Sequence, residues 1–340
     1  MSRLSQSPQL FTIVRDLGLK ASDNLVRDIL RFCDRRVADL VADFSDRRNP
    51  SAVLDWIASK LGTRFEMVWN DSDLINLQEK YVALGEVGFI DLFNELSDDV
   101  FGITIRRHKQ QPHEPPFVSV IDCRGTKGSR RYFTKWHEVA HLITMTDQLR
   151  LEFRRTNCST QNKDPEEALM DVIAGQFGFR PPADFQFHAE DISFEAIDKL
   201  RQELCPEASR QAALISFVKF WPGPCMLITA KMALRKRDEV QCLQNKFDFA
   251  DGPAQHLRAV YVTQSDIARE VDFTIFRNMR VPESSVIHQV YSHDVPYLEA
   301  KEDLDIWESS DGKALKPCLV SVKARRSWDG VEALITPVST

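Results

Sequence analysis

The chain lacks long hydrophobic runs. Nowhere in the sequence do roughly 18 apolar residues follow one another, which is the length that a membrane-spanning helix requires. The first residues, MSRLSQSPQLFTIVRDLG, contain no apolar core of the kind that a secretory signal peptide needs. Glycine and proline are also scarce, with 13 and 16 residues, which argues against collagen-like and low-complexity classes. We therefore expect a globular protein that is neither exported nor membrane-bound.

A basic surplus and regularly spaced cysteines are missing as well. The formal net charge is -6, and the short basic runs are isolated in an acidic background, so direct nucleic-acid binding is not expected. The seven cysteines are scattered and include no C-x-x-C pair, so the sequence indicates neither a disulfide framework nor a cysteine zinc site. Because reduced thiols are typical of the cytoplasm, we expect the protein to be cytoplasmic.

The chain does contain a clear succession of helical and strand-like patterns. Residues 1–45 carry apolar side chains at helical spacing and are predicted to form an N-terminal helical segment. Residues 46–240 combine several helices with a small β-sheet, and residues 241–340 change to short alternating runs such as LRAVYVT and VDFTIF. We therefore predict an α+β fold, with a mainly helical central domain followed by a β-rich C-terminal domain.

Two strands and two helices of the central domain are needed for the functional argument. The strands are predicted at Val100–Arg106 and Phe117–Asp122, joined as an antiparallel hairpin by the polar segment HKQQPHEPP. A helix follows from Thr134, whose hydroxyl is a candidate cap. The next helix begins at Asp164, which is followed by a first-turn proline, Pro165.

The first of these helices contains the string HEVAH at residues 137–141. Two imidazoles four residues apart project from one face of a helix, so His137 and His141 can bind one Zn²⁺. Glu138 is then the candidate general base, which takes a proton from the attacking water and returns it to the leaving amine. A chance HExxH string occurs in on the order of one chain in a hundred of this length. We therefore interpret this string as a metal site.

A catalytic zinc needs a third protein ligand, and Glu167 in the first turn of the next helix is the leading candidate. Asp171 lies one turn further on the same face, where its carboxylate can orient a ligating histidine through the second ring nitrogen. Alternatives remain open for both residues. Glu167 can be a capping-box residue after Asp164, Glu166 is the other candidate ligand, and Asp171 can be a salt-bridged surface residue.

Residues 130–141, RRYFTKWHEVAH, resemble the active-site helix of the ImmA/IrrE family of metallopeptidases, in which arginines and a Phe-Thr pair lead into HExxH. The preceding strand pair is similar too. Residues 167–181 resemble the second motif of that family, where a glutamate is followed four residues later by Asn or Asp and the helix ends in proline. The resemblance covers about residues 50–235.

The resemblance implies a gluzincin-like zinc metallopeptidase domain over residues 46–240. Family members of this kind cleave a partner protein, often a helix-turn-helix transcriptional repressor, and so act in stress response, defence or mobile-element control. The β-rich region over residues 241–340 is comparable in placement to the sensor-like extension of some members. It is therefore expected to recognise the substrate or an activating signal.

Competing functions follow from the same residues. The leading hypothesis is a narrow-specificity zinc endopeptidase, and the alternative is a catalytically silent metal-binding regulator that holds a partner without cutting it. The presence of Glu138 favours the enzyme, because a binding module has no need of a general base. A fourth protein ligand would instead indicate a structural zinc site.

Three further residues, His188, His293 and Asp294, are weaker candidates for a proton donor.

Overall fold

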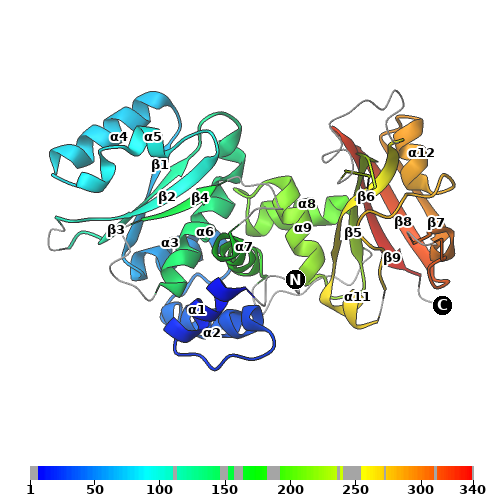
Figure 1. Cartoon of the computed structure of the whole chain (residues 1–340), viewed down its shortest axis with the longest axis horizontal. Coiled ribbons are helices and arrows are strands. Elements are labelled where there is room, and N and C mark those ends of the chain that lie inside the picture. Colours follow the sequence, from blue (N-terminus) through cyan, green and yellow to red (C-terminus); the bar gives the residue numbers. More distant parts are fainter. Residues whose placement is uncertain are drawn as a thin grey trace. The chain divides into compact units, whose positions relative to one another are not determined.

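The chain folds into two units (Figure 1). The first comprises Met1–Ala183 with Leu200–Ala213, and the second comprises Asp184–Lys199 with Leu214–Thr340. The computed structural model describes residues 7–109, 113–145, 152–156 (backbone alone), 164–181, 192–235, 238–239, 254–271, 273–309 and 312–338. Both helices and strands occur in these residues, so the predicted α+β class is confirmed.

The first unit is built on a four-stranded sheet with the order β1-β3-β2-β4. Its strands are β1 (Thr63–Val68), β2 (Val100–Arg106), β3 (Phe117–Asp122) and β4 (Glu152–Thr156). β1 runs parallel to β3, whereas β2 is antiparallel to both of its neighbours. The antiparallel pairing of β2 and β3 confirms the predicted hairpin. Its register places Thr104 of β2 opposite Ser119 of β3.

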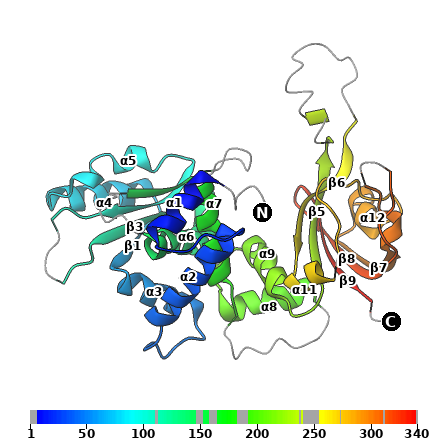
Figure 2. The same cartoon turned by 60° about the horizontal axis from the view of Figure 1, so that its bottom comes forward.

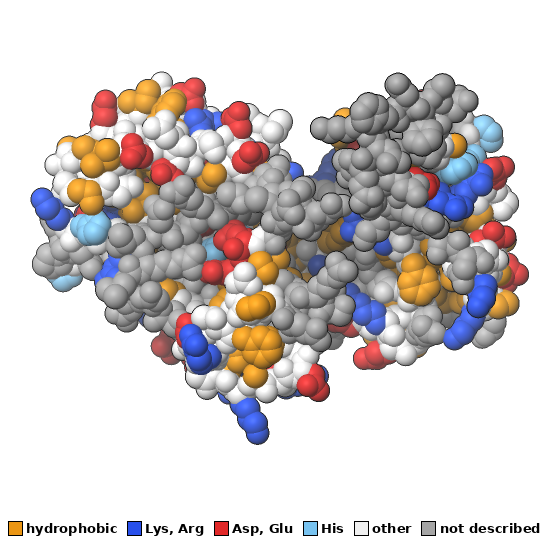
Figure 3. All heavy atoms as spheres, in the orientation of Figure 1, with side chains coloured by type: hydrophobic (Ala, Val, Ile, Leu, Met, Phe, Trp, Pro, Cys, Tyr) orange, Lys and Arg blue, Asp and Glu red, His pale blue; other side chains and the backbone are white. Residues whose placement is uncertain are grey.

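One face of this sheet is covered by α4 (Asp71–Ala83), η2 (Val87–Phe89) and α5 (Leu92–Glu95) (Figure 1). Apolar side chains of these elements form a buried cluster with alternate residues of the strands, among them Ile103, Ile105, Val118 and Val120. The outer side of the same segment is also apolar, and hydrophobic side chains gather there in Figure 3. Its exposed large residues are Ile75, Val82, Leu84, Val87, Ile90 and Phe93.

Helix α6 (Arg131–Thr144) lies against the opposite face of the sheet, where it contacts β2, β3 and β4. It packs along α7 (Pro165–Gly178), with α1 (Pro8–Asp16), α2 (Leu25–Leu40) and α3 (Pro50–Lys60) nearby in the same unit. The N-terminal helices therefore belong to the first unit and do not form a separate domain. α6 is buried on almost every side, as expected for a helix enclosed between a sheet and other helices.

The end of α7 is held against α6 by a glycine. A Cβ atom at Gly178 would lie 2.9 Å from Cδ1 of Trp136, so only glycine allows this close approach. The hydroxyl of Tyr132 donates a hydrogen bond to the carbonyl oxygen of Gly178 over 2.5 Å. These contacts align the two helices that carry the predicted metal ligands.

The start of α6 differs from the prediction. The helix begins at Arg131, directly after the 3-10 helix η3 (Gly125–Arg130), and it has no side-chain cap. Thr134 therefore lies inside the first turn, where its hydroxyl donates to the carbonyl oxygen of Arg130 over 3.0 Å. The predicted cap at Thr134 is wrong because the preceding 3-10 turn already leads the backbone into the helix.

The second unit contains a five-stranded antiparallel sheet with the order β6-β5-β9-β8-β7. Its strands are β5 (Met226–Ala233), β6 (His256–Gln264), β7 (Tyr297–Asp303), β8 (Leu319–Ser327) and β9 (Gly330–Pro337). Helix α12 (Val286–Ser292) packs on one face (Figure 2) and shares a buried core with it. The second unit also contains α11 (Asp266–Glu270) and η4 (Leu304–Ile306), whereas α8 (Phe194–Leu204) and α9 (Arg210–Phe220) each contribute residues to both units.

Two predictions for this region need correction. β5 pairs with β6 and β9, so the second unit does not start at residue 241 but includes Asp184–Lys199 and the chain from Leu214 onward. The run VDFTIF forms no strand over residues 273–276, because Ala259 of β6 already pairs with the turn at Asn278 and Met279.

Among the described residues, no helix is both long and apolar enough to cross a membrane.

Candidate metal centre

Helix α6 presents two histidines on the side that faces α7. His137 and His141 are four residues apart, so one turn of helix places both rings on the same face. Their ring centroids lie 5.1 Å apart. Both side chains are buried, and a buried imidazole pair needs polar partners to offset its lost hydration.

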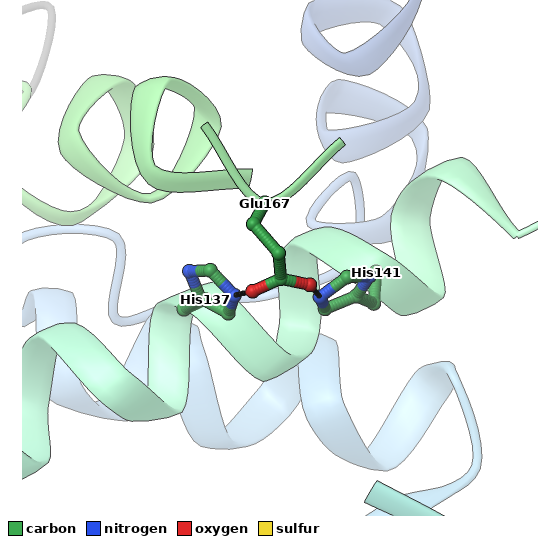
Figure 4. Close-up of side chains that lie close together, drawn as sticks. All are labelled: His137, His141 and Glu167. Atoms are coloured by element: carbon green, nitrogen blue, oxygen red, sulfur yellow. Dashed lines mark hydrogen bonds and ion pairs between the residues drawn. The ribbon is translucent and has the colours of Figure 1, made fainter. Parts of the chain in front are cut away.

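The main partner is Glu167 from the first turn of α7. That turn begins at Asp164, whose carboxylate accepts a hydrogen bond from the backbone N–H of Glu166 over 2.7 Å. Glu167 extends between the two rings (Figure 4), with one oxygen 3.1 Å from Nε2 of His137 and the other 3.2 Å from Nε2 of His141. The structure thus brings together the three residues that were predicted as metal ligands.

Each histidine also contacts a carboxylate through its second ring nitrogen. Oδ1 of Asp171 lies 2.8 Å from Nδ1 of His137, in the position expected for a residue that orients this ring. Oε1 of Glu166 lies 3.7 Å from Nδ1 of His141. Glu166 therefore sits behind the ring and not among the three converging donor atoms. This place of Glu166 beside His141 was not predicted from the sequence, which offered the residue only as an alternative metal ligand.

These contacts shift the pKa values of the buried groups. Burial alone would raise the pKa of Glu167, but hydrogen bonds with His137 and His141 outweigh it and lower the pKa to about 2. Burial would lower the pKa of His141, but the carboxylates of Glu166 and Glu167 beside the ring outweigh it and raise the pKa to about 9. Glu167 is therefore ionised at neutral pH, which favours a cation between the two rings.

The three donor residues fit a divalent metal ion such as zinc. One donor atom from each of His137, His141 and Glu167 lies within 4.8 Å of the other two. Ligand atoms about 2.1 Å from a tetrahedral zinc ion lie about 3.4 Å from one another, close to the two nitrogen–oxygen distances of 3.1 and 3.2 Å. Two imidazoles and a carboxylate are also a common ligand set of catalytic zinc.

Glu138 points from α6 towards the sheet. Its Oε2 accepts a hydrogen bond from the hydroxyl of Thr104 over 2.8 Å, whereas Oε1 has no hydrogen-bond partner among the described residues. A Cβ atom at Gly102 would lie 3.0 Å from Oε1, so the glycine of β2 keeps the space beside this oxygen open. Burial raises the pKa of Glu138.

Thr104 was missed by the sequence analysis, although a signal was present. It is a polar residue between Ile103 and Ile105 in a fully buried strand. Such a hydroxyl needs a hydrogen-bond partner, but the sequence does not reveal which one.

Two of the three weaker candidates, His293 and Asp294, belong to the second unit. His293 follows the last residue of α12, and Asp294 forms an ion pair with Arg326 over 3.0 Å, both within the second unit. His188 lies outside the described residues. The metal-site proposal therefore depends on α6 and α7 alone.

Comparison of the chain with protein-family models and with curated proteins gives no match. The resemblance to the ImmA/IrrE family thus depends on the motif residues of α6 and α7.

Proposed function

We propose that the chain is a zinc-dependent endopeptidase with a zincin-like core, which cleaves a specific partner protein such as a helix-turn-helix repressor. The observation that carries this proposal is the convergence of His137, His141 and Glu167 beside a buried glutamate on the same helix. When bound, zinc would acidify a water molecule and polarise the scissile carbonyl. The choice of a repressor as substrate comes from the resemblance to the ImmA/IrrE family.

The residues of the chain divide the remaining tasks. Asp171 accepts a hydrogen bond from Nδ1 of His137, which leaves Nε2 of that ring as the metal-binding atom. Glu138 takes the proton of the attacking water and returns it to the leaving amine. Oε1 is the oxygen suited to this transfer, because Oε2 is already engaged by Thr104.

The first test replaces the general base. Glu138→Gln should keep the zinc content of the wild type and lower the rate of repressor cleavage by about 10²- to 10⁴-fold, the usual contribution of general acid–base catalysis. Zinc is measured by elemental analysis, and cleavage of a repressor encoded beside the gene is measured by mass spectrometry. Glu79→Gln, the same change at an exposed position of α4, is the matched control. Undiminished cleavage by Glu138→Gln would reject the mechanism.

The second test removes the third ligand. Glu167→Ala should weaken zinc binding by more than about 100-fold, because changes that only disturb the orientation of a ligand already cost 10- to 100-fold. Glu166→Ala is the comparison variant, because its carboxylate lies behind the ring of His141, and its loss should weaken zinc binding by about tenfold or less. If Glu166→Ala loses zinc and Glu167→Ala retains it, the ligand assignment is wrong.

One observation favours the alternative of a silent metal-binding regulator. His137, His141 and Glu138 are all buried, with exposed fractions of 0%, 1% and 0%, so a substrate reaches them only after a local opening. Turnover separates the two functions. A wild-type protein that binds zinc and the repressor but cleaves no peptide bond is a regulator and not a peptidase.

A further inference from the structure

Three hydroxyl groups form a continuous hydrogen-bonded chain that ends on Glu138. Thr104 Oγ1 lies 2.8 Å from Oε2 of Glu138, and Ser119 Oγ lies 2.7 Å from Oγ1 of Thr104. Thr63 Oγ1 follows, 2.9 Å from Oγ of Ser119. The exposed fractions of Thr104, Ser119 and Thr63 are 0%, 0% and 4%. We refer to these three residues as the hydroxyl chain.

The sheet register explains why these side chains meet. Each hydroxyl comes from a different strand: Thr104 from β2, Ser119 from β3 and Thr63 from β1. Thr104 is directly opposite Ser119, and Phe65 is the direct partner of Ser119 on the other side, which places Thr63 diagonally on the same face. The hydroxyl chain therefore crosses the sheet on the face that carries α6.

The carboxylate sets the direction of every hydrogen bond in the hydroxyl chain. Thr104 donates its single hydroxyl proton to Oε2 of Glu138. Ser119 must then donate to Thr104, and Thr63 must donate to Ser119. Thr63 is the last member of the hydroxyl chain, and it lines a cavity of about 800 Å³ on the β1 side of the sheet.

We propose that Thr104, Ser119 and Thr63 are positioning residues for Glu138. They hold Oε2 in one orientation, so that Oε1 lies beside Gly102 without a hydrogen-bond partner among the described residues and remains free to accept a proton. Packing alone does not require them, because valine or alanine would fill the same volumes without a polar group to satisfy. The hydrogen bonds of the hydroxyl chain are independent of the proposed function. Their effect on catalysis rests on the proposed peptidase function.

The first experiment tests the hydroxyl chain without zinc or substrate. A double-mutant cycle combines Thr104→Val with Glu138→Met in the full-length, metal-free protein, and hydrogen exchange is measured for the peptides that cover β2 and α6. Each variant lowers the protection factors of these peptides by some fold. If Thr104 and Glu138 are coupled, the fold decrease in the double variant is about ten times smaller than the product of the fold decreases in the two single variants. Thr229→Val, a buried threonine of β5 in the second unit, is the matched control. It should show no coupling to Glu138→Met.

The second experiment measures cleavage of the repressor by zinc-loaded enzyme. Thr104→Val should lower kcat by about 10- to 100-fold, the value of a hydrogen bond to a charged group, with KM and zinc content unchanged. Thr104→Ser should restore most of the rate, because it restores the hydroxyl. Ser119→Ala and Thr63→Val should show progressively smaller losses, since they act through Thr104.

The outcomes separate the two proposals. Absence of coupling in the metal-free cycle, or equal kcat for Thr104→Val and wild type, overturns the role of the hydroxyl chain. Equal losses for Thr104→Ser and Thr104→Val overturn it as well, because packing would then be the cause. If the metal-free cycle shows coupling but the zinc-loaded wild type shows no turnover, the hydroxyl chain is supported and the proposed peptidase function is refuted.

Discussion

The carboxylate of Asp171 offers the sharpest test of the metal centre, because it contacts a proposed ligand without being one. Oδ1 lies 2.8 Å from Nδ1 of His137, which is a short charge-assisted hydrogen bond. Loss of such a partner typically weakens metal binding by 10- to 100-fold. Since 32% of the Asp171 side chain is exposed, solvent screens the interaction, and we expect the lower part of this range.

Asp171→Ala should therefore weaken zinc binding by about tenfold, equivalent to about 1.4 kcal/mol. Asp171→Asn should have a smaller effect, because its amide oxygen still accepts the hydrogen bond but carries no charge. Zinc affinity is measured at constant pH by competition with a chromophoric chelator, and the melting temperature is recorded in parallel.

Asp164→Asn is the matched control for this measurement. It removes one negative charge from the same helix, and asparagine caps a helix start about as well as aspartate. Zinc affinity should stay within about twofold of the wild type in this variant. If Asp171→Ala binds zinc as tightly as Asp164→Asn, the carboxylate does not orient His137, and the reasoning is refuted.

Two further predictions concern the scaffold of the metal centre. Gly178→Ala should destabilise the first unit by about 1–3 kcal/mol through overpacking against Trp136. The loss is measured as a lower midpoint of urea unfolding. An unchanged midpoint would contradict the close approach of Gly178 to Trp136. Burial would raise the pKa of Asp122, but hydrogen bonds from Arg124 and Lys127 outweigh it and lower the pKa. The stabilisation by this carboxylate is thus present above its unfolded pKa and is lost as the pH falls through the folded value. Asp122→Asn should cost about 2–3 kcal/mol at pH 7 and progressively less below about pH 4, and a pH-independent difference would refute this assignment.

The local features of the metal centre could be predicted from the sequence. Helical spacing by itself places His137 and His141 on one face, since residues four apart are always neighbours on a helix. The start of α7 was equally clear, because Asp164 and Pro165 act on the backbone within a few residues. The pairing of β2 and β3 followed from two apolar runs joined by a polar connection.

Other features were decided only by the tertiary structure. Glu166 and Glu167 are adjacent, and the packing of α7 on α6 determines which of them meets both Nε2 atoms and which lies behind a ring. The hydroxyl chain depends on the register of three strands, which a one-residue shift would destroy by turning each side chain to the other face. The boundary before β5 likewise follows from strand pairing over long distances in the chain. The sequence by itself thus determined the helix that carries the two candidate metal ligands, whereas long-range packing decided which carboxylate and which hydroxyls surround it.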